Sequence, residues 1–154
     1  MENKERKVKN VILRYIARLL VPCILMLGMY IILNGHLSPG GGFQGGVLMV
    51  GVATLIYFGH GYQTTIETFS FHLLHETEAL ASVFYVALGM LGVAVGAQFA
   101  QNILFKHGAI GELYSSGTIF WMNVTVGVKV ITGVGSIALL LLGLLQERNE
   151  KEVK

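Results

Sequence analysis

Four long apolar runs occupy most of this chain, and they constrain its fold more than any other feature. They cover about residues 11–34, 43–62, 80–101 and 119–145, with short polar segments between them. As a helix, each run is long enough to cross a hydrocarbon core about 30 Å thick. We therefore predict an all-α integral membrane protein with four transmembrane helices and short loops.

The composition supports this class and excludes others. The chain is 53% hydrophobic and only 13% charged, which is far from the average of soluble domains. Four spans within 154 residues leave no room for a separate soluble catalytic domain, so any chemistry has to occur at or in the bilayer. A net charge of +2 gives no indication of nucleic-acid binding. The single cysteine, Cys23, can form no intrachain disulfide.

The first apolar run follows a basic leader, which is also the pattern of a secretory signal sequence. No small-residue cleavage site follows the run, and three further spans make a retained helix the simpler interpretation. Pro22 lies inside the run and is expected to bend this helix, which neighbouring helices can tolerate in a membrane.

The distribution of Lys and Arg predicts the orientation. Basic residues precede the first run, the first two loops have none, and the third loop has only Lys106. The residues before and at the start of the first run are Lys4, Arg6, Lys7, Lys9, Arg14 and Arg18. Basic loops stay on the cytoplasmic side, so we expect a cell-membrane protein with both termini in the cytoplasm. Residues 1–10 and 146–154 would be cytoplasmic tails around a membrane domain at 11–145.

A glycine-rich stretch connects the first two runs. Residues 36–46 read His-Leu-Ser-Pro-Gly-Gly-Gly-Phe-Gln-Gly-Gly. Nothing near it has the Lys-Ser or Lys-Thr that would complete a phosphate-binding loop. Glycines permit a tight turn and close backbone approach, and Pro39 can begin the next helix. These residues alone indicate a tight connection between two membrane helices. The predicted orientation places this connection on the outer side of the membrane.

This stretch closely resembles the signature of the B-type subunit of Mrp multisubunit sodium/proton antiporters, the MnhB-domain family. The spacing of the apolar runs extends the resemblance from Arg14 to about Leu145. The signature positions are His36, Ser38, Pro39, Gly40, Gly41, Gly42, Phe43, Gln44, Gly45 and Gly46. By this resemblance, they shape a subunit contact or an ion entrance.

The resemblance implies a membrane subunit of a cation (sodium)/proton antiporter, contributing to the ion path or to its assembly. Its implied partners are other membrane subunits, sodium ions, protons and the lipid bilayer, with no cofactor and no catalytic residue in this chain. Related subunits also occur in membrane-bound hydrogenases and sulfur-reducing respiratory complexes. There the chain would be a non-catalytic subunit of a redox-driven pump, and the sequence does not separate the two settings. A purely structural subunit is a further alternative.

Lys129 is the charged residue placed deepest in an apolar run. It stands ten positions inside the fourth run, about 15 Å along a helix and near the bilayer midplane. A lysine there costs about 2.5 to 3.5 kcal/mol unless it is paired, hydrated or neutral. Thr125, Thr132 and Ser136 share its helix face and complete a polar stripe. The stripe indicates either an ion path or a structural ion pair, with the counter-charge expected from another subunit or from water.

Residues 63–79 form the most polar internal segment, with His72, His75, Glu76 and Glu78. Apolar residues at helical spacing predict a short interfacial helix or an extension of the third span, on the cytoplasmic side. These four residues, and His60 at the end of the second run, are candidate protonatable groups at the mouth of an ion path. The alternative for residues 63–79 is a solvated acidic loop. The alternative for His60 is a hydrogen-bonded histidine at the membrane interface.

A metal-dependent membrane enzyme would need His72, His75 and Glu76 as ligands. Their spacing matches no motif with established metal chemistry, so we predict no metal site.

Gly92 and Gly96 form a G-x-x-x-G pair in the third run, which predicts a helix-packing face. The loop after that run holds Lys106, His107 and Glu112 and is expected to be a simple connector. It ends in residues 115–118, Ser-Ser-Gly-Thr, which are predicted to cap the last helix.

Overall fold

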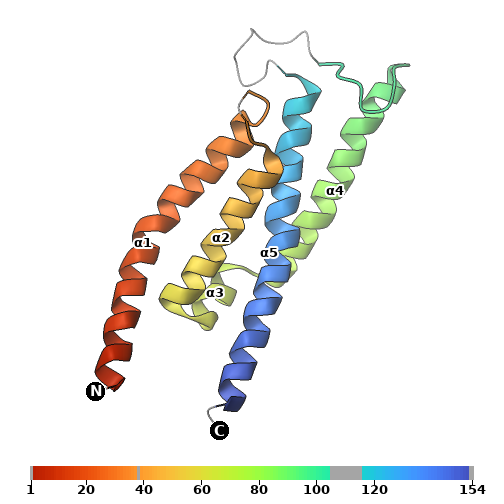
Figure 1. The fold of residues 1–154 in the computed structure, drawn as a ribbon. Coiled ribbons are helices and arrows are strands. Elements are labelled where there is room, and N and C mark those ends of the chain that lie inside the picture. Colours follow the sequence, from red (N-terminus) through yellow and green to blue (C-terminus); the bar gives the residue numbers. More distant parts are fainter. Residues whose placement is uncertain (1, 38, 105–115, 153–154) are drawn as a thin grey trace.

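The computed structural model describes residues 2–37, 39–104 and 116–152 of the chain. Within these residues the chain forms only helices (Figure 1). They are α1 (Glu2–Asn34), α2 (Gly42–His60), α3 (Tyr62–Thr68), α4 (Phe71–Ala94) and α5 (Thr118–Glu152). Four are long and apolar enough to cross a membrane: Val11–Asn34, Gly42–His60, Phe71–Ala94 and Thr118–Arg148. The predicted all-α fold with four spans is confirmed.

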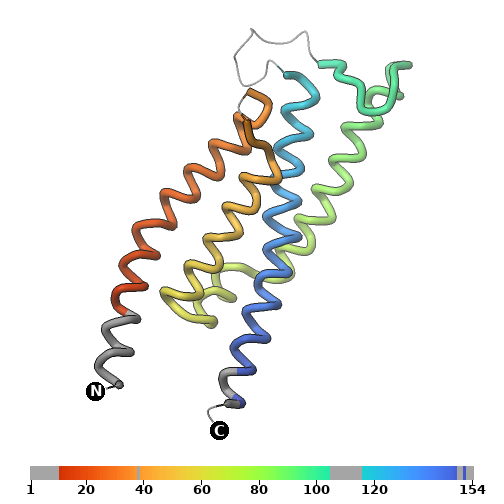
Figure 2. Tube along the Cα trace, viewed as in Figure 1, coloured from red at the N-terminus to blue at the C-terminus, as the bar shows by residue number. Residues whose placement is uncertain are grey.

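The four long helices lie side by side in the order α1, α2, α5, α4 (Figure 2). Helix α2 packs against α1 and α5, and α4 packs against α5 on its other side. Both ends of the chain lie at one end of this layer, together with α3, and the turn between α1 and α2 lies at the other. A layer one helix thick buries little of its apolar surface. Large side chains such as Leu19, Met26 and Val83 are about 70% exposed, as expected where lipid or other membrane helices supply the contacts.

The third span is displaced from its predicted position. Helix α4 begins at Phe71 instead of Leu80 and ends at Ala94 instead of Gln101. The polar segment before Leu80 therefore extends the span, as one of the two alternatives predicted. Its helix buries Leu74, and His72 and Glu76 approach to 3.5 Å across one turn. Glu76 and Glu78 of this segment therefore fall within the candidate span Phe71–Ala94.

The prediction of a Gly92–Gly96 packing face is also wrong. Gly96 lies beyond the end of α4 with a φ of +79°, a conformation that glycine adopts without steric cost. A β-carbon on Gly92 would collide with the main-chain oxygen of Gln98 rather than with another helix. These glycines therefore serve a chain reversal, in which Ala97 N donates to Gly92 O at 2.9 Å.

The start of α5 is capped by Asn102, which lies outside the cap sequence predicted at residues 115–118. The Asn102 side chain accepts a hydrogen bond from Thr118 N at 3.0 Å and donates one to Ser116 O at 2.9 Å. Asn102 thus satisfies a backbone donor at the start of α5 from the connecting loop. Residues 105–115, with Lys106, His107, Glu112 and Ser115, lie outside the described residues.

Candidate ion-path groove and signature loop

The signature glycines bring three helices into close contact. A β-carbon on Gly42 would collide with the α5 main chain at Asn123 and would lie 2.7 Å from Gly127 N. A β-carbon on Gly46 would lie 2.8 Å from Val130 of α5. Gly45 faces the opposite way, where a β-carbon would lie 2.7 Å from Gly28 O of α1. The first two turns of α2 are therefore wedged between α1 and α5 at distances that only glycine permits.

Asn123 joins the same three helices by hydrogen bonds. Its Oδ1 accepts from Gly42 N at 2.7 Å, and its Nδ2 donates to Ile32 O at 2.6 Å. One α5 side chain thus satisfies the first turn of α2 and a carbonyl in the last turn of α1, where both groups lack helical partners. Asn123 was not among the site residues predicted from the sequence. Its position inside an apolar run could have indicated a role, because a buried amide is costly without hydrogen-bond partners.

The remaining signature residues point away from this contact or lie at its edge. The His36 ring packs edge-on against Phe120 of α5, with ring centroids 5.6 Å apart. Its two ring nitrogens are buried without a hydrogen-bond partner in the described part of the chain. Pro39, Phe43 and Gln44 are exposed. Ser38 lies outside the described residues.

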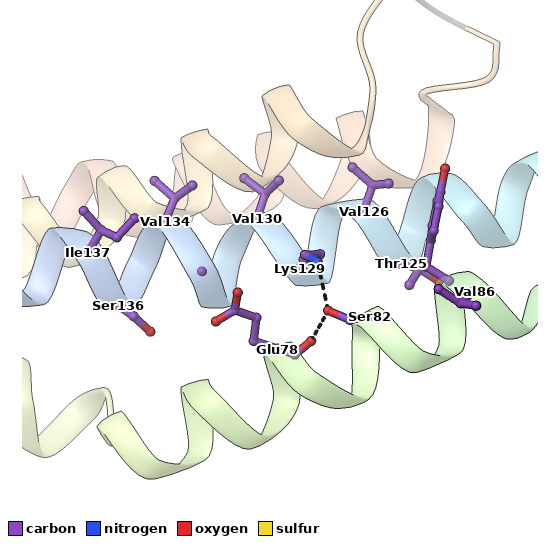
Figure 3. Close-up of a pocket in the computed structure, with 12 residues that line it drawn as sticks. Glu78, Ser82, Val86, Thr125, Val126, Lys129, Val130, Val134, Ser136 and Ile137 are labelled. Atoms are coloured by element: carbon purple, nitrogen blue, oxygen red, sulfur yellow. Dashed lines mark hydrogen bonds between the residues drawn. The ribbon is translucent and has the colours of Figure 1, made fainter.

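Lys129 lies in a groove of about 570 Å³ along the contact between α4 and α5 (Figure 3). Its Nζ donates a hydrogen bond to Ser82 Oγ of α4 at 2.9 Å, and Ser82 Oγ donates to the main-chain oxygen of Glu78 at 2.9 Å. The polar lining consists of Glu78, Ser82, Tyr85, Thr125, Lys129 and Ser136, and the other lining residues are apolar apart from Gly133. The polar groups of two helices thus converge on one groove.

Glu78 supplies a carboxylate inside the same groove. The residue is half-buried, and its Oε1 lies 3.1 Å from the position that a β-carbon on Gly133 would occupy. Gly133 follows Lys129 by one helical turn, so the acid and the base lie one turn apart on facing helices. This chain therefore holds an acidic group in the same groove as Lys129, whereas the sequence led us to expect the counter-charge from another subunit or from water. Glu78 was among the ion-path candidates predicted from the sequence, whereas Ser82 and Gly133 were not.

The hydroxyl groups of the predicted stripe donate to their own helix. Thr125 Oγ1 donates to Trp121 O at 2.7 Å, Thr132 Oγ1 to Val128 O at 3.0 Å, and Ser136 Oγ to Thr132 O at 2.7 Å. Thr125 and Ser136 line the groove, whereas Thr132 is not among its lining residues, although Thr125 and Thr132 are equally buried. Because their protons are engaged, Thr125 and Ser136 offer oxygen lone pairs to the groove.

The other candidate residues lie apart from Lys129. His60 ends α2 and lines a second groove of about 750 Å³ with Gln63 and Glu147, near the chain ends. His72, His75 and Glu76 are exposed on the first turns of α4. Among the described residues, no group of three or more His, Cys, Asp and Glu is placed to hold a metal ion. The structure brings together Lys129, Thr125, Ser136 and Glu78, and leaves His60, His72 and His75 outside this groove.

Comparison with known proteins gives consistent matches. A family model described as a domain related to the MnhB subunit of the Na+/H+ antiporter matches residues 12–147. An uncharacterized protein of Methanocaldococcus jannaschii is 32% identical over 135 residues, which cover 84% of this chain and 51% of that protein. The putative antiporter subunit mnhB2 of Staphylococcus aureus is 27% identical over 142 residues, which cover 90% of this chain and 96% of that subunit.

A solved structure is also similar. A chain of the membrane-bound sulfane sulfur reductase, an archaeal respiratory membrane complex, aligns with a TM-score of 0.69 and 36% identity. The alignment covers 85% of this chain and 57% of that chain. The present chain thus spans little more than half the length of the archaeal relatives and nearly the whole staphylococcal subunit.

Proposed function

The chain belongs to the family of domains related to the MnhB subunit of Na+/H+ antiporters, and on this premise we propose that it is a membrane subunit of a multisubunit Mrp-type cation (sodium)/proton antiporter. The observation that carries the proposal is the extent of the family match. Residues 12–147 include nearly all of the four candidate spans, the glycine signature and Lys129. The partners are other membrane subunits, with sodium ions and protons as the transported species.

Within that antiporter, the α4–α5 groove contributes to the ion path. Charged groups in the membrane are costly and usually serve transport or a specific pairing. Lys129 supplies the charge, and the oxygens of Thr125 and Ser136 line the same groove. The groove lies on the surface of a layer only one helix thick, so a neighbouring subunit can complete its wall. The glycine signature serves assembly by fixing α1, α2 and α5 through Asn123.

The same module in a membrane-bound hydrogenase or sulfur-reducing complex is the second candidate. It is favoured by the 36% identity to a chain of the sulfane sulfur reductase complex, against 27% to the staphylococcal antiporter subunit. Coverage favours the antiporter instead, because this chain matches nearly the full staphylococcal subunit. In the second setting, electron flow through other subunits would drive the ion movement, and this chain would again hold no cofactor.

The proposed location is the cell membrane, with both termini in the cytoplasm. Arg14, Arg18, Arg148 and Lys151 lie toward the two chain ends, which are at the same end of the layer (Figure 1). A surplus of basic residues on that side supports a cytoplasmic position. An alkaline phosphatase fusion after Lys154 tests this orientation. It should be inactive in intact cells, and an active fusion would place the C-terminus outside.

Purification of the assembled complex tests the proposed function. The chain is tagged after Lys154, native membranes are solubilised in mild detergent, and the co-purifying proteins are identified by mass spectrometry. Antiporter-like membrane subunits alone are the expected result. Iron–sulfur or nickel-binding subunits in the same complex would favour the redox-driven candidate. Recovery of the chain without any other membrane protein would contradict both.

A further inference from the structure

The α4–α5 groove holds both an acid and a base, and their geometry suggests more than a fixed charge. In the described part of the chain, Glu78 and Lys129 are the only ionisable groups with full charges that line it. Their side chains point into the same groove from facing helices, with Ser82 beside Lys129 (Figure 3). No ion pair joins these two described residues within 4 Å, and the Lys129 ammonium donates to Ser82 Oγ instead. Lys129 therefore shares the groove with two groups that can accept from its ammonium, Ser82 Oγ and the Glu78 carboxylate.

We propose that Glu78 and Lys129 form a switchable acid–base pair within this chain, in which the Lys129 ammonium moves between Ser82 Oγ and the Glu78 carboxylate. The inference rests on the proposed function and assigns its exchange site to Glu78. With the ammonium on Ser82, the Glu78 carboxylate is free to bind a proton or a monovalent cation. With the ammonium on Glu78, that proton or cation is displaced.

Ser82 is suited to hold the ammonium in the first position. Its hydroxyl proton is directed to Glu78 O at 2.9 Å, so its lone pair faces Lys129 Nζ, also at 2.9 Å. The second position is one helical turn away, about 5.4 Å along the axis, which a flexible four-carbon side chain can span. Gly133 keeps that position open, because a β-carbon there would press on the Glu78 carboxylate.

The exchange at Glu78 needs only a proton transfer to water and no other reactant. When the ammonium arrives, the Glu78 O–H bond breaks, its proton passes to water in the groove, and Lys129 keeps its three protons. When a sodium ion occupies the carboxylate, the ammonium displaces the ion instead. Proton and cation therefore compete for one carboxylate.

Carbodiimide labelling of the assembled complex tests the pair independently of transport. Dicyclohexylcarbodiimide reacts with protonated carboxyl groups in apolar surroundings, and mass spectrometry locates the label. Labelling of Glu78 should be about fivefold faster in Lys129→Gln, because no ammonium then competes with the proton for the carboxylate. Sodium chloride in place of choline chloride should slow labelling in the wild-type complex. Glu76, exposed on the same helix, is the internal control and should keep its rate in both complexes.

A second variant preserves the test if Lys129→Gln fails to assemble. Ser82→Ala removes the first position, so the ammonium stays on Glu78 and labelling falls about threefold. Equal labelling of Glu78 in wild type, Lys129→Gln and Ser82→Ala would overturn the pair, as would no labelling of Glu78 in any of them. The proposed function is judged separately by sodium-driven proton flux. If Lys129→Gln loses flux while the labelling of Glu78 is unchanged, the proposed function stands and the switchable pair is rejected.

Discussion

Gly42→Ala should disrupt the three-helix contact at the signature loop. The new β-carbon would collide with the α5 main chain at Asn123 and would lie 2.7 Å from Gly127 N. Backbone atoms of a helix cannot rotate away, so α2 has to shift from α5. That shift also stretches the bond from Gly42 N to Asn123 Oδ1, now 2.7 Å. The substitution therefore combines an overpacking cost with a lost hydrogen bond.

Each of these costs is about 1 to 3 kcal/mol, which gives a total destabilisation of about 4 kcal/mol. For a chain of this size, 1 kcal/mol lowers the melting temperature by about 2 to 4 °C, so the expected loss is about 10 °C. The assay heats aliquots of the solubilised complex and follows the tagged chain by size-exclusion chromatography with fluorescence detection.

Gly51→Ala is the matched control in the same helix. Apart from the adjoining backbone of α2 itself, no atom lies within 4 Å of the position of a β-carbon there, and alanine favours helix over glycine by about 1 kcal/mol. Its melting temperature should equal or slightly exceed that of the wild type. Equal melting temperatures for Gly42→Ala and Gly51→Ala would refute the reasoning that the signature glycines serve close packing.

Three further substitutions have defined outcomes. Asn123→Leu leaves Gly42 N without its partner and should lower the melting temperature by about 5 °C in the same assay; an unchanged value would remove Asn123 from the contact. Asn102→Ala removes the cap at Thr118 and should cost about 1 kcal/mol, seen as faster amide hydrogen exchange confined to the first turn of α5. His75→Ala and treatment with a chelator should each leave sodium-driven flux unchanged, since His75 is exposed; loss of flux with loss of bound metal would revive a metal site.

Hydropathy was sufficient to predict the number and type of spans. The first, second and fourth runs match their helices closely because strongly apolar stretches are bounded by polar or glycine-rich turns. The third run failed at both ends. The polarity of residues 71–79 left open whether they extend the span, which they do as the first turns of α4. The mostly apolar residues 95–101 were predicted as helix, although the chain reverses there. Mean polarity does not reveal which face of a helix carries the polar groups.

The candidate site was predictable only in part. Lys129 stood out because a single charge in an apolar run has a large cost. Its relation to Glu78 depended on where α4 begins and on the packing of α4 against α5, which no local pattern encodes. Ser82 and Gly133 gain their importance only from facing these two groups. The hydrogen bonds of Asn123 likewise join α5 to residues distant in sequence.

Sodium-driven proton flux in membrane vesicles carrying the whole complex tests the central claim most directly. Lys129→Ala should abolish flux while the complex assembles normally, because the groove then lacks its in-membrane cation. Lys151→Ala, an exposed lysine near the end of the same helix, is the control and should transport like the wild type. Unchanged flux in an assembled Lys129→Ala complex would contradict a role of this groove in the ion path and leave the chain a purely structural subunit.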